Sequence, residues 1–226
     1  MIFVLIHSPL VGPTTWSSVA RELQHRGHEA LVPSLVGPTD ALRSWQREVD
    51  TVRHAIQPLL GPIVLVAHSG AGLLLPLIAD TAAAPVSKLI FVDSGVPPSS
   101  GETPLVPPFF LDHLRTLAVD GVLPPWSAWF GDDTMGDLLP DDDLRSELVH
   151  EMPSLPLAYF EQRIPIPTGW DRTPCAYLLL SDAYKESAVE AREHNWPVEE
   201  ITGAQHLHIA VDPDAVTDAL IRLTIA

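Results

Sequence analysis

Short apolar runs alternate with amphipathic segments through the first 95 residues of the chain. Residues 2–6, 63–67 and 88–92 are mostly apolar and have the length of a buried strand. Residues 14–26 and 44–60 carry apolar side chains at the spacing of a helix. Strands that are continuously apolar, and not alternating, are typical of a parallel sheet covered by helices on both faces.

The alternation stops after residue 95 and resumes at residue 173. Residues 96–172 are rich in proline and aromatic side chains, and no run among them predicts a strand. We expect short helices there, near 109–119, 142–152 and 155–163. The sequence therefore predicts one α/β domain, a mostly parallel sheet of about six strands with helices on both faces, formed by 1–95 and 173–226. Residues 96–172 are interpreted as a helical cap over this sheet, or as an extra helical layer that touches no site.

Composition narrows the class of partner. Apolar residues make up 46% of the 226 residues and the formal net charge is −16. Nucleic acids and anionic membranes require a basic patch, so neither is an expected partner, whereas a small-molecule substrate is. The N-terminal apolar stretch has no basic segment before it, so we do not expect it to be a secretory signal. No apolar run reaches the length of a membrane span, so we expect no membrane-spanning helix. Cys175 is the only cysteine, so we expect a cytoplasmic protein without an internal disulfide. A homodimer is left open.

The strongest chemical signal lies between an apolar run and an amphipathic segment. Here the sequence is Ala67-His68-Ser69-Gly70-Ala71-Gly72. A serine on a sharp strand-to-helix turn is exposed as a nucleophile, and the turn needs small residues on either side. It would also aim the Gly70 N–H at a developing oxyanion. The alternatives are a serine that only caps the helix and a dinucleotide loop, which lacks its third glycine.

A nucleophilic serine needs a base, and the base needs an orienting acid. His206 follows the last predicted strand, and His208 is the rival base. Asp182 follows the strand before that histidine, which is the usual place for the acid, so we predict Asp182. Asp93, which also ends a strand, is the alternative acid. No third ligand accompanies the two histidines, so no metal site is predicted.

Three blocks of the chain carry a resemblance to a known family. They are residues 3–7 leading through Trp16 to 26–28, residues 67–70, and residues 203–206 with Pro213 after them. With these blocks the chain resembles the α/β-hydrolase fold superfamily, nearest to the small plant-type methyl esterases and hydroxynitrile lyases. The resemblance covers nearly the whole chain in order, except that 96–172 matches by position alone. It implies an α/β-hydrolase fold with a Ser-His-acid triad and no cofactor.

The chain departs from this family after its first strand. The family pattern is His-Gly-x, in which the N–H of x is an oxyanion donor, but here the residues are His7-Ser8-Pro9 and proline has no N–H. The Ser8 hydroxyl is the nearest substitute and the Leu10 N–H the second choice. The lyase branch resembles the chain at Ser8, but it carries a lysine where this chain has Leu207, so cyanide release is not expected.

These observations favour a serine hydrolase that cleaves a carboxylic ester, lactone or thioester through Ser69, His206 and Asp182. Aromatic residues of the inserted segment suggest an apolar or aromatic substrate, because ligand sites are mostly apolar. One alternative is a cofactor-free lyase, cyclase or isomerase with His206 as general acid and base, and another is a non-catalytic binding protein. The candidates for substrate-lining residues are Trp126, Trp129, Tyr159 and His208.

Overall fold

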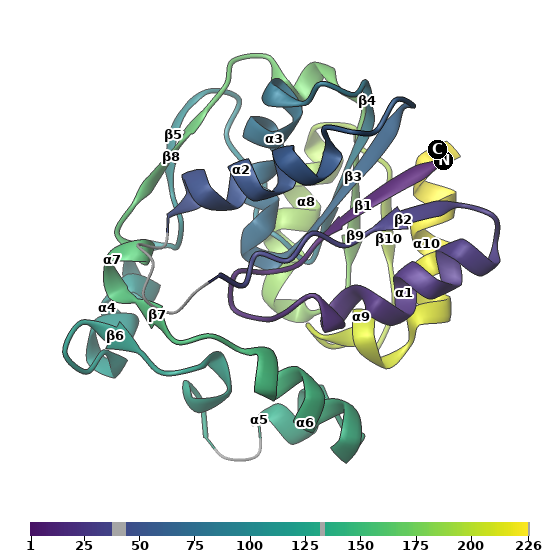
Figure 1. The fold of residues 1–226 in the computed structure, drawn as a ribbon. Coiled ribbons are helices and arrows are strands. Elements are labelled where there is room, and N and C mark those ends of the chain that lie inside the picture. The colour runs from purple at the N-terminus through teal and green to yellow at the C-terminus, as the bar shows by residue number, and fades with distance from the viewer. Residues whose placement is uncertain (38–43, 132–133, 226) are drawn as a thin grey trace.

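A six-stranded parallel sheet forms the centre of the protein (Figure 1). The structure is a computed structural model that describes residues 1–37, 44–131 and 134–225. The four inner strands are mostly apolar runs, as the sequence predicts, whereas the two edge strands, over 29–31 and 198–200, carry glutamate side chains. In spatial order the strands are β10 (Val198–Glu200), β9 (Cys175–Leu179), β4 (Val86–Val92), β3 (Ile63–His68), β1 (Ile2–Ile6) and β2 (Glu29–Leu31). The order reverses direction between β1 and β3, and open parallel sheets bind ligands at such a point, beyond the carboxyl ends of the strands.

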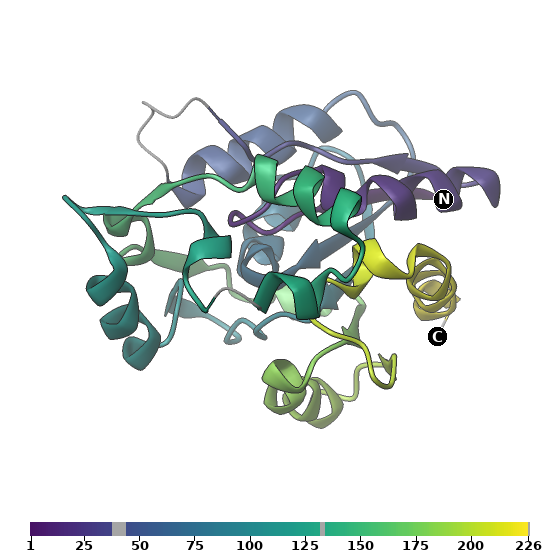
Figure 2. The same ribbon diagram turned by 90° about the horizontal axis from the view of Figure 1, so that it is seen from below.

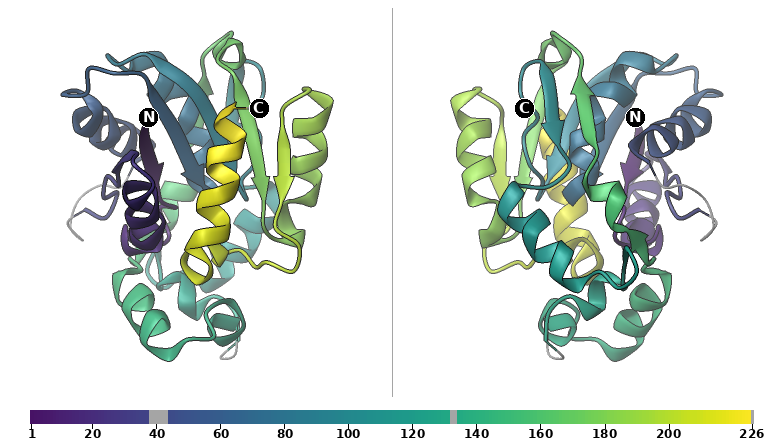
Figure 3. Two further views of the ribbon diagram at one scale, coloured as in Figure 1. Left: turned by 90° about the vertical axis from the view of Figure 1, so that its right-hand side faces the viewer. Right: turned by 90° about the vertical axis from the view of Figure 1, so that its left-hand side faces the viewer.

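Helices cover both faces of this sheet (Figure 3). Helices α1 (Thr14–His25) and α10 (Pro213–Ile225) contribute to one buried apolar cluster. Helices α2 (Trp45–Ile56), α3 (Leu75–Thr81) and α8 (Lys185–Glu193) contribute to the other. The predicted fold class is therefore confirmed. Among the described residues, no helix combines the length and the apolar character that crossing a bilayer demands.

Both clusters draw on the same strands. Phe3 and Leu5 of β1 lie in the cluster of α1 and α10, whereas Val4 and Ile6 lie in the other, and all four are fully buried. Successive side chains of a strand point to opposite faces, so a strand buried on both sides must be apolar throughout. This is the physical reason for the continuous apolar runs.

Most of the segment between β4 and β9 lies beyond the carboxyl ends of the strands, in teal and green at the bottom of Figure 3 and facing the viewer in Figure 2, whereas its two short strands over 101–104 and 163–166 run alongside α3 (Figure 1). The expected helices near 109–119 and 142–152 are present. The expectation of no strand is wrong, and the helix expected over 155–163 is present as a single turn over 157–160. The elements are β5 (Gly101–Pro104), α4 (Pro108–Leu117), β6 (Val122–Leu123), α5 (Thr134–Leu138), α6 (Asp142–Glu151), β7 (Leu155–Pro156), α7 (Leu157–Phe160) and β8 (Arg163–Ile166).

These strands escaped prediction because they are short and three of the four contain proline. β5 pairs with β8, and β6 pairs with β7, each in a two-stranded antiparallel ribbon. A strand in a two-stranded ribbon needs hydrogen bonds on one edge alone, so Pro104 and Pro165 fit where a central strand would reject them.

One contact ties this segment to the N-terminus of α1. The Thr14 N–H and hydroxyl donate hydrogen bonds of 3.0 and 2.8 Å to the carboxylate of Glu151, at the end of α6. Pro13, at the N-cap of α1, provides no side-chain cap. A Cβ atom on Gly12 would lie 2.0 Å from Glu151 Oε2, so glycine is required for the approach. Glu151 thus caps a helix that is far from it in sequence.

Replacing Glu151 with alanine should lower the free energy of unfolding by about 1–3 kcal/mol, because α1 loses a charged cap. Urea denaturation measures the change. Glu147→Ala is the matched control, since Glu147 lies on the exposed side of the same helix. Equal effects of the two substitutions would show that the Thr14 contact does not stabilise the fold.

Candidate active site

Ser69 lies at the turn between β3 and a 3₁₀ helix over Ser69–Leu74. Its φ angle is 58°, in the left-handed region that non-glycine residues rarely occupy. The turn is tightly packed, because a Cβ atom on Gly72 would lie 1.8 Å from Ser94 Oγ. Backbone strain of this kind is concentrated at functional sites. The expected strand–turn–helix context of Ser69 is therefore present.

A chain of hydrogen bonds leads away from the Ser69 hydroxyl. His206 Nε2 lies 3.0 Å from Ser69 Oγ, and His206 Nδ1 lies 2.6 Å from Asp93 Oδ2. Since a carboxylate only accepts, Nδ1 carries the proton and Nε2 can accept from the serine. The structure thus brings together Ser69, His206 and the carboxylate of Asp93, the alternative acid.

Asp93 is fully buried at the end of β4. Its Oδ1 accepts from the N–H groups of Leu180 and Ser181 at 2.9 and 2.8 Å, and its Oδ2 accepts from the Ser181 hydroxyl at 2.5 Å. Burial alone would raise the pKa of Asp93, but the hydrogen bond and charge of His206 and the Ser181 hydrogen bonds together hold that pKa below its ordinary value. Asp93 is therefore ionised beside His206.

The structure does not place Asp182, the predicted acid, in this chain of hydrogen bonds. The Asp182 side chain is 89% exposed, and its carboxylate forms an ion pair of 2.7 Å with Lys185. The physical reason is the direction of the two carboxylates. Ser181, the residue before Asp182, donates to the Asp93 carboxylate, so the end of β9 reaches the site, but the Asp182 carboxylate is exposed and paired with Lys185. Asp93 directly follows β4, but Asp182 comes after β9 has already ended at Leu179.

His68 lies directly beneath His206, with the ring centroids 4.5 Å apart. It is fully buried, and its Nε2–H donates a 2.9 Å hydrogen bond to the His206 carbonyl. Burial, followed by the neighbouring His206 charge, lowers the pKa of His68 to about 3. The neutral ring therefore holds the backbone of His206. The sequence pattern gave no sign of this role.

His68→Gln should weaken the acid sensitivity of the fold. The native state keeps His68 neutral down to about pH 3, whereas the unfolded chain takes up a proton near pH 6.5. Stability is therefore lost as pH falls from 6.5 towards 3, at up to about 1.4 kcal/mol per pH unit for one proton. Urea denaturation between pH 4 and 7 should show a smaller slope for His68→Gln than for the parent. His54→Gln, at an exposed position, is the control, and an unchanged slope for both variants would contradict the prediction.

The loop after β1 lies against the serine turn. A Cβ atom on Gly70 would lie 3.8 Å from Pro9 Cδ, the atom that replaces the missing N–H proton. The Leu10 N–H donates to Ser8 Oγ at 3.3 Å, so it is already engaged. The Ser8 hydroxyl accepts this bond and keeps its own proton to donate. Ser8 thus remains a candidate oxyanion donor with Gly70, whose N–H lies in the first turn of the 3₁₀ helix, where amides lack helical partners.

Two cavities meet at Ser69. The first, of about 400 Å³, contains His206 and is called here the His206 chamber. The second, of about 500 Å³, contains Gly70 and is called the Gly70 chamber. Residues lining both chambers are Ser8, Leu10, Ser69, Phe110, Ala183 and Tyr184. The His206 chamber adds the apolar side chains of Val11, Trp126, Phe130, Leu138 and Leu207. The Gly70 chamber adds those of Leu73, Val96, Leu105, Val106, Tyr159 and Phe160.

Tyr184 stands at the junction of the chambers and was not predicted from the sequence. Its ring stacks on His206 with centroids 5.3 Å apart, and its hydroxyl lies 3.5 Å from Ser69 Oγ. Burial raises the pKa of the Tyr184 hydroxyl, so it stays protonated as a donor. The sequence gives no signal for Tyr184, because the residue of this loop that it singles out is Asp182, the expected acid.

The predicted lining residues divide between site and core. Trp126 lies edge-on to His206 at 6.0 Å, and Tyr159 lines the Gly70 chamber while its hydroxyl donates to Glu48 at 2.6 Å. Trp129 is a packing residue, 4% exposed, whose indole N–H donates to the Pro124 carbonyl. His208 begins the helix His208–Val211 and lines neither chamber. Among the described residues, no group of three metal-ligating side chains converges.

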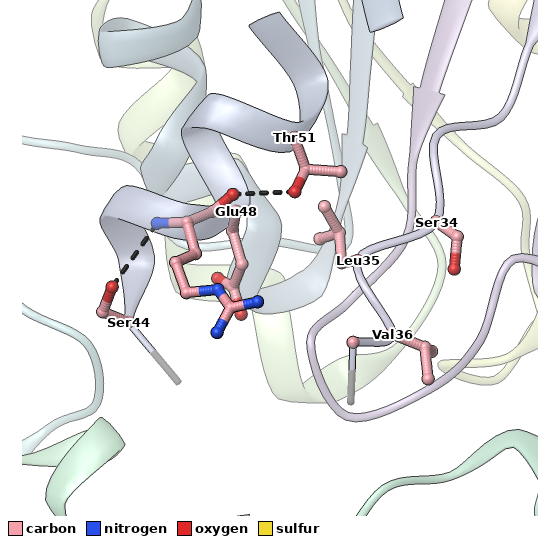
Figure 4. Close-up of a pocket in the computed structure, with 8 residues that line it drawn as sticks. Ser34, Leu35, Val36, Ser44, Glu48 and Thr51 are labelled. Atoms are coloured by element: carbon pink, nitrogen blue, oxygen red, sulfur yellow. Dashed lines mark hydrogen bonds between the residues drawn. The ribbon is translucent and has the colours of Figure 1, made fainter. Parts of the chain in front are cut away.

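A smaller cavity, of about 40 Å³, lies at the N-terminus of α2 (Figure 4). There the Thr51 hydroxyl donates to the Arg47 carbonyl at 2.8 Å, and the Arg47 N–H donates to Ser44 Oγ at 3.4 Å. This cavity shares no lining residue with the two chambers.

Comparison with known proteins identifies the family of the chain. The model of the Alpha/beta hydrolase family matches residues 3–219. The chain belongs to this family. The hydrolase is also 26% identical to Methylesterase 8 of Arabidopsis thaliana, over 98% of this chain and 88% of that protein. The expected resemblance to the methyl esterase branch is thereby confirmed, and the chain is an esterase-type α/β hydrolase.

Solved structures show the same fold at lower identity. An extracellular alpha/beta-hydrolase from a Paenibacillus species superposes with a TM-score of 0.78 at 16% identity, covering 99% of this chain and 98% of its own. A pyrethroid hydrolase, PytH, superposes with a TM-score of 0.76 at 19% identity, covering 100% of this chain and 98% of its own. Polyneuridine aldehyde esterase superposes with a TM-score of 0.73 at 18% identity, covering 99% of this chain and 98% of its own.

Proposed function

We propose that this hydrolase cleaves carboxylic esters of apolar small molecules with Ser69 as nucleophile, His206 as base and Asp93 as orienting acid. The observation that carries the proposal is the unbroken hydrogen-bond chain from Ser69 Oγ through His206 to the buried Asp93. Nucleophile, base and orienter within hydrogen-bond reach are the signature of an activated serine.

The chemistry proceeds in two stages. Ser69 Oγ attacks the ester carbonyl carbon and gives its proton to His206 Nε2, while Asp93 stabilises the resulting imidazolium. The C–O bond to the alcohol breaks, and the alcohol oxygen takes that proton. Water then attacks the acyl-enzyme in the same way, which releases the carboxylic acid and frees Ser69. The Gly70 N–H and the Ser8 hydroxyl stabilise the oxyanion of each tetrahedral intermediate.

The segment 96–172 is the cap of this site in our proposal. It supplies Phe110, Trp126, Phe130 and Leu138 to the His206 chamber, opposite the serine. Closing a site with apolar walls excludes water and strengthens the electrostatic interactions inside. The names of the esterases and of the pyrethroid hydrolase described above also favour an ester substrate.

A fluorophosphonate probe tests the proposal. We expect stoichiometric labelling of the protein, with the modified peptide containing Ser69, and no labelling of Ser69→Ala. Turnover of aryl acetates should disappear with the same substitution. Absence of both labelling and turnover in the correctly folded parent would overturn the proposal. It would favour a proton-transfer lyase, cyclase or isomerase, for which the missing amide donor at Pro9 is the motivating observation.

A further inference from the structure

We infer that the substrates are uncharged esters with a bulky apolar group on both sides of the ester bond, the alcohol part in the His206 chamber and the acyl part in the Gly70 chamber. This inference rests on the proposed ester hydrolysis. It concerns which ester is cleaved and how it lies, which the hydrogen-bond chain alone leaves open.

The direction follows from the two groups that flank Ser69. His206 Nε2, 3.0 Å from Ser69 Oγ, must return its proton to the departing alcohol oxygen, so that oxygen lies on the His206 side. Gly70, which supplies the oxyanion donor, lines the other chamber and is absent from the wall of the first. With the alcohol on one side and the oxyanion directed at Gly70, the acyl chain extends into the Gly70 chamber.

The size of the His206 chamber argues for a bulky alcohol. A cavity of about 150 Å³ is large enough to bind benzene, and this chamber measures about 400 Å³. A methyl ester would leave its walls of Trp126, Phe130, Leu138 and Leu207 uncovered. An aromatic alcohol would bury apolar surface against them, at about 25 cal/mol per Å².

The charges favour a neutral molecule. Among the described residues that line the two chambers, none is lysine or arginine. The carboxylates present are those of Asp182 and Glu186, both on exposed residues at the chamber openings. A free carboxylate or a phosphate on the substrate would therefore find no basic side chain among these lining residues.

A pair of isomeric esters distinguishes the preference of one chamber from that of the other. Benzyl acetate has a bulky alcohol and a small acyl group, whereas methyl phenylacetate has the reverse. Benzyl phenylacetate is bulky on both sides and should have the highest kcat/KM of the three, about tenfold or more above methyl phenylacetate, since one methylene in an apolar pocket changes this ratio by about 10- to 200-fold. A kcat/KM for methyl phenylacetate equal to or above that of benzyl phenylacetate would overturn the inference.

Narrowing one chamber at a time tests the direction. Leu138→Trp should lower kcat/KM for benzyl acetate about tenfold or more and that for methyl phenylacetate less than about twofold. Val106→Trp, in the Gly70 chamber, should show the opposite pattern. A reversed pattern would overturn the assigned direction, and no selectivity in either variant would overturn the two-chamber arrangement. If a tryptophan variant fails to fold by circular dichroism, Leu138→Phe and Val106→Phe make the same comparison.

Fluorophosphonate labelling of Ser69 distinguishes failure of the assigned chambers from failure of the proposed reaction. Absence of labelling together with failure to cleave all three esters contradicts the proposed ester hydrolysis itself. Labelling of Ser69 and cleavage of esters with the wrong order of preference contradicts only the assignment of the chambers.

Discussion

Asp93→Asn should lower kcat about ten-thousandfold, the loss found when the acid of a serine triad becomes an amide. An amide can present its NH₂ to His206 and favour the tautomer with the proton on Nε2, which cannot accept from Ser69. Asp182→Asn should change kcat less than about twofold, because its carboxylate is exposed and paired with Lys185. Initial rates of phenyl acetate hydrolysis, with labelling rates at Ser69, measure both.

The two aspartates provide matched controls for each other. The side-chain amide introduced by Asp93→Asn still offers an oxygen to the N–H groups of Leu180 and Ser181, so the variant should remain folded. The pKa of Asp93 is lower in the native state than in the unfolded chain. The ionised carboxylate therefore stabilises the fold at pH values above the ordinary pKa of aspartate, and this stabilisation is lost as the pH falls through the lower native pKa. A larger loss of kcat in Asp182→Asn than in Asp93→Asn would return the role of acid to the sequence-based choice.

The sequence predicted the parts of the site that depend on local pattern. Ser69 could be found because an apolar strand, small residues and a helix surround it within a few positions. His206 could be found from its place after the last strand. The choice between Asp93 and Asp182 depends on which carboxylate is directed at His206, and this is a property of the three-dimensional arrangement, not of either residue's neighbours in the sequence. One local signal was present, since aspartate three residues before Lys185 is typical of an exposed helix start.

The same distinction explains the fold. The four inner strands of the central sheet are buried on both faces, so their positions follow directly from apolar runs. β5 has no buried residue, and β8 alternates over only four residues that include Pro165, so neither strand gives a pattern long enough to predict it. Tyr184 and His68 acquire their roles only through contact with His206, which lies far from both along the chain. Such contacts become visible only when the strands and loops are placed in three dimensions.

Ser8→Ala should lower kcat about 100- to 1000-fold with little change in KM, the usual loss for one oxyanion donor. The donor acts on charge that develops only in the transition state, so ground-state binding is hardly affected. Ser8→Thr, which keeps the hydroxyl, should retain most of the activity. Unchanged kcat in a folded Ser8→Ala variant would remove Ser8 from the proposed mechanism.

A second substitution shows whether Ser8 compensates for Pro9. Pro9 Cδ points towards Gly70, so alanine at this position would place an N–H where the ring now lies. The double variant Ser8→Ala with Pro9→Ala should therefore have a kcat at least about tenfold above that of Ser8→Ala, because a backbone donor replaces the hydroxyl. Pro9→Ala alone should raise kcat by a smaller factor, because the Ser8 hydroxyl already supplies one donor. If the double variant has the same kcat as Ser8→Ala, the new N–H does not reach the oxyanion. The Ser8 hydroxyl would then act at a different place from the amide donor that is missing at Pro9.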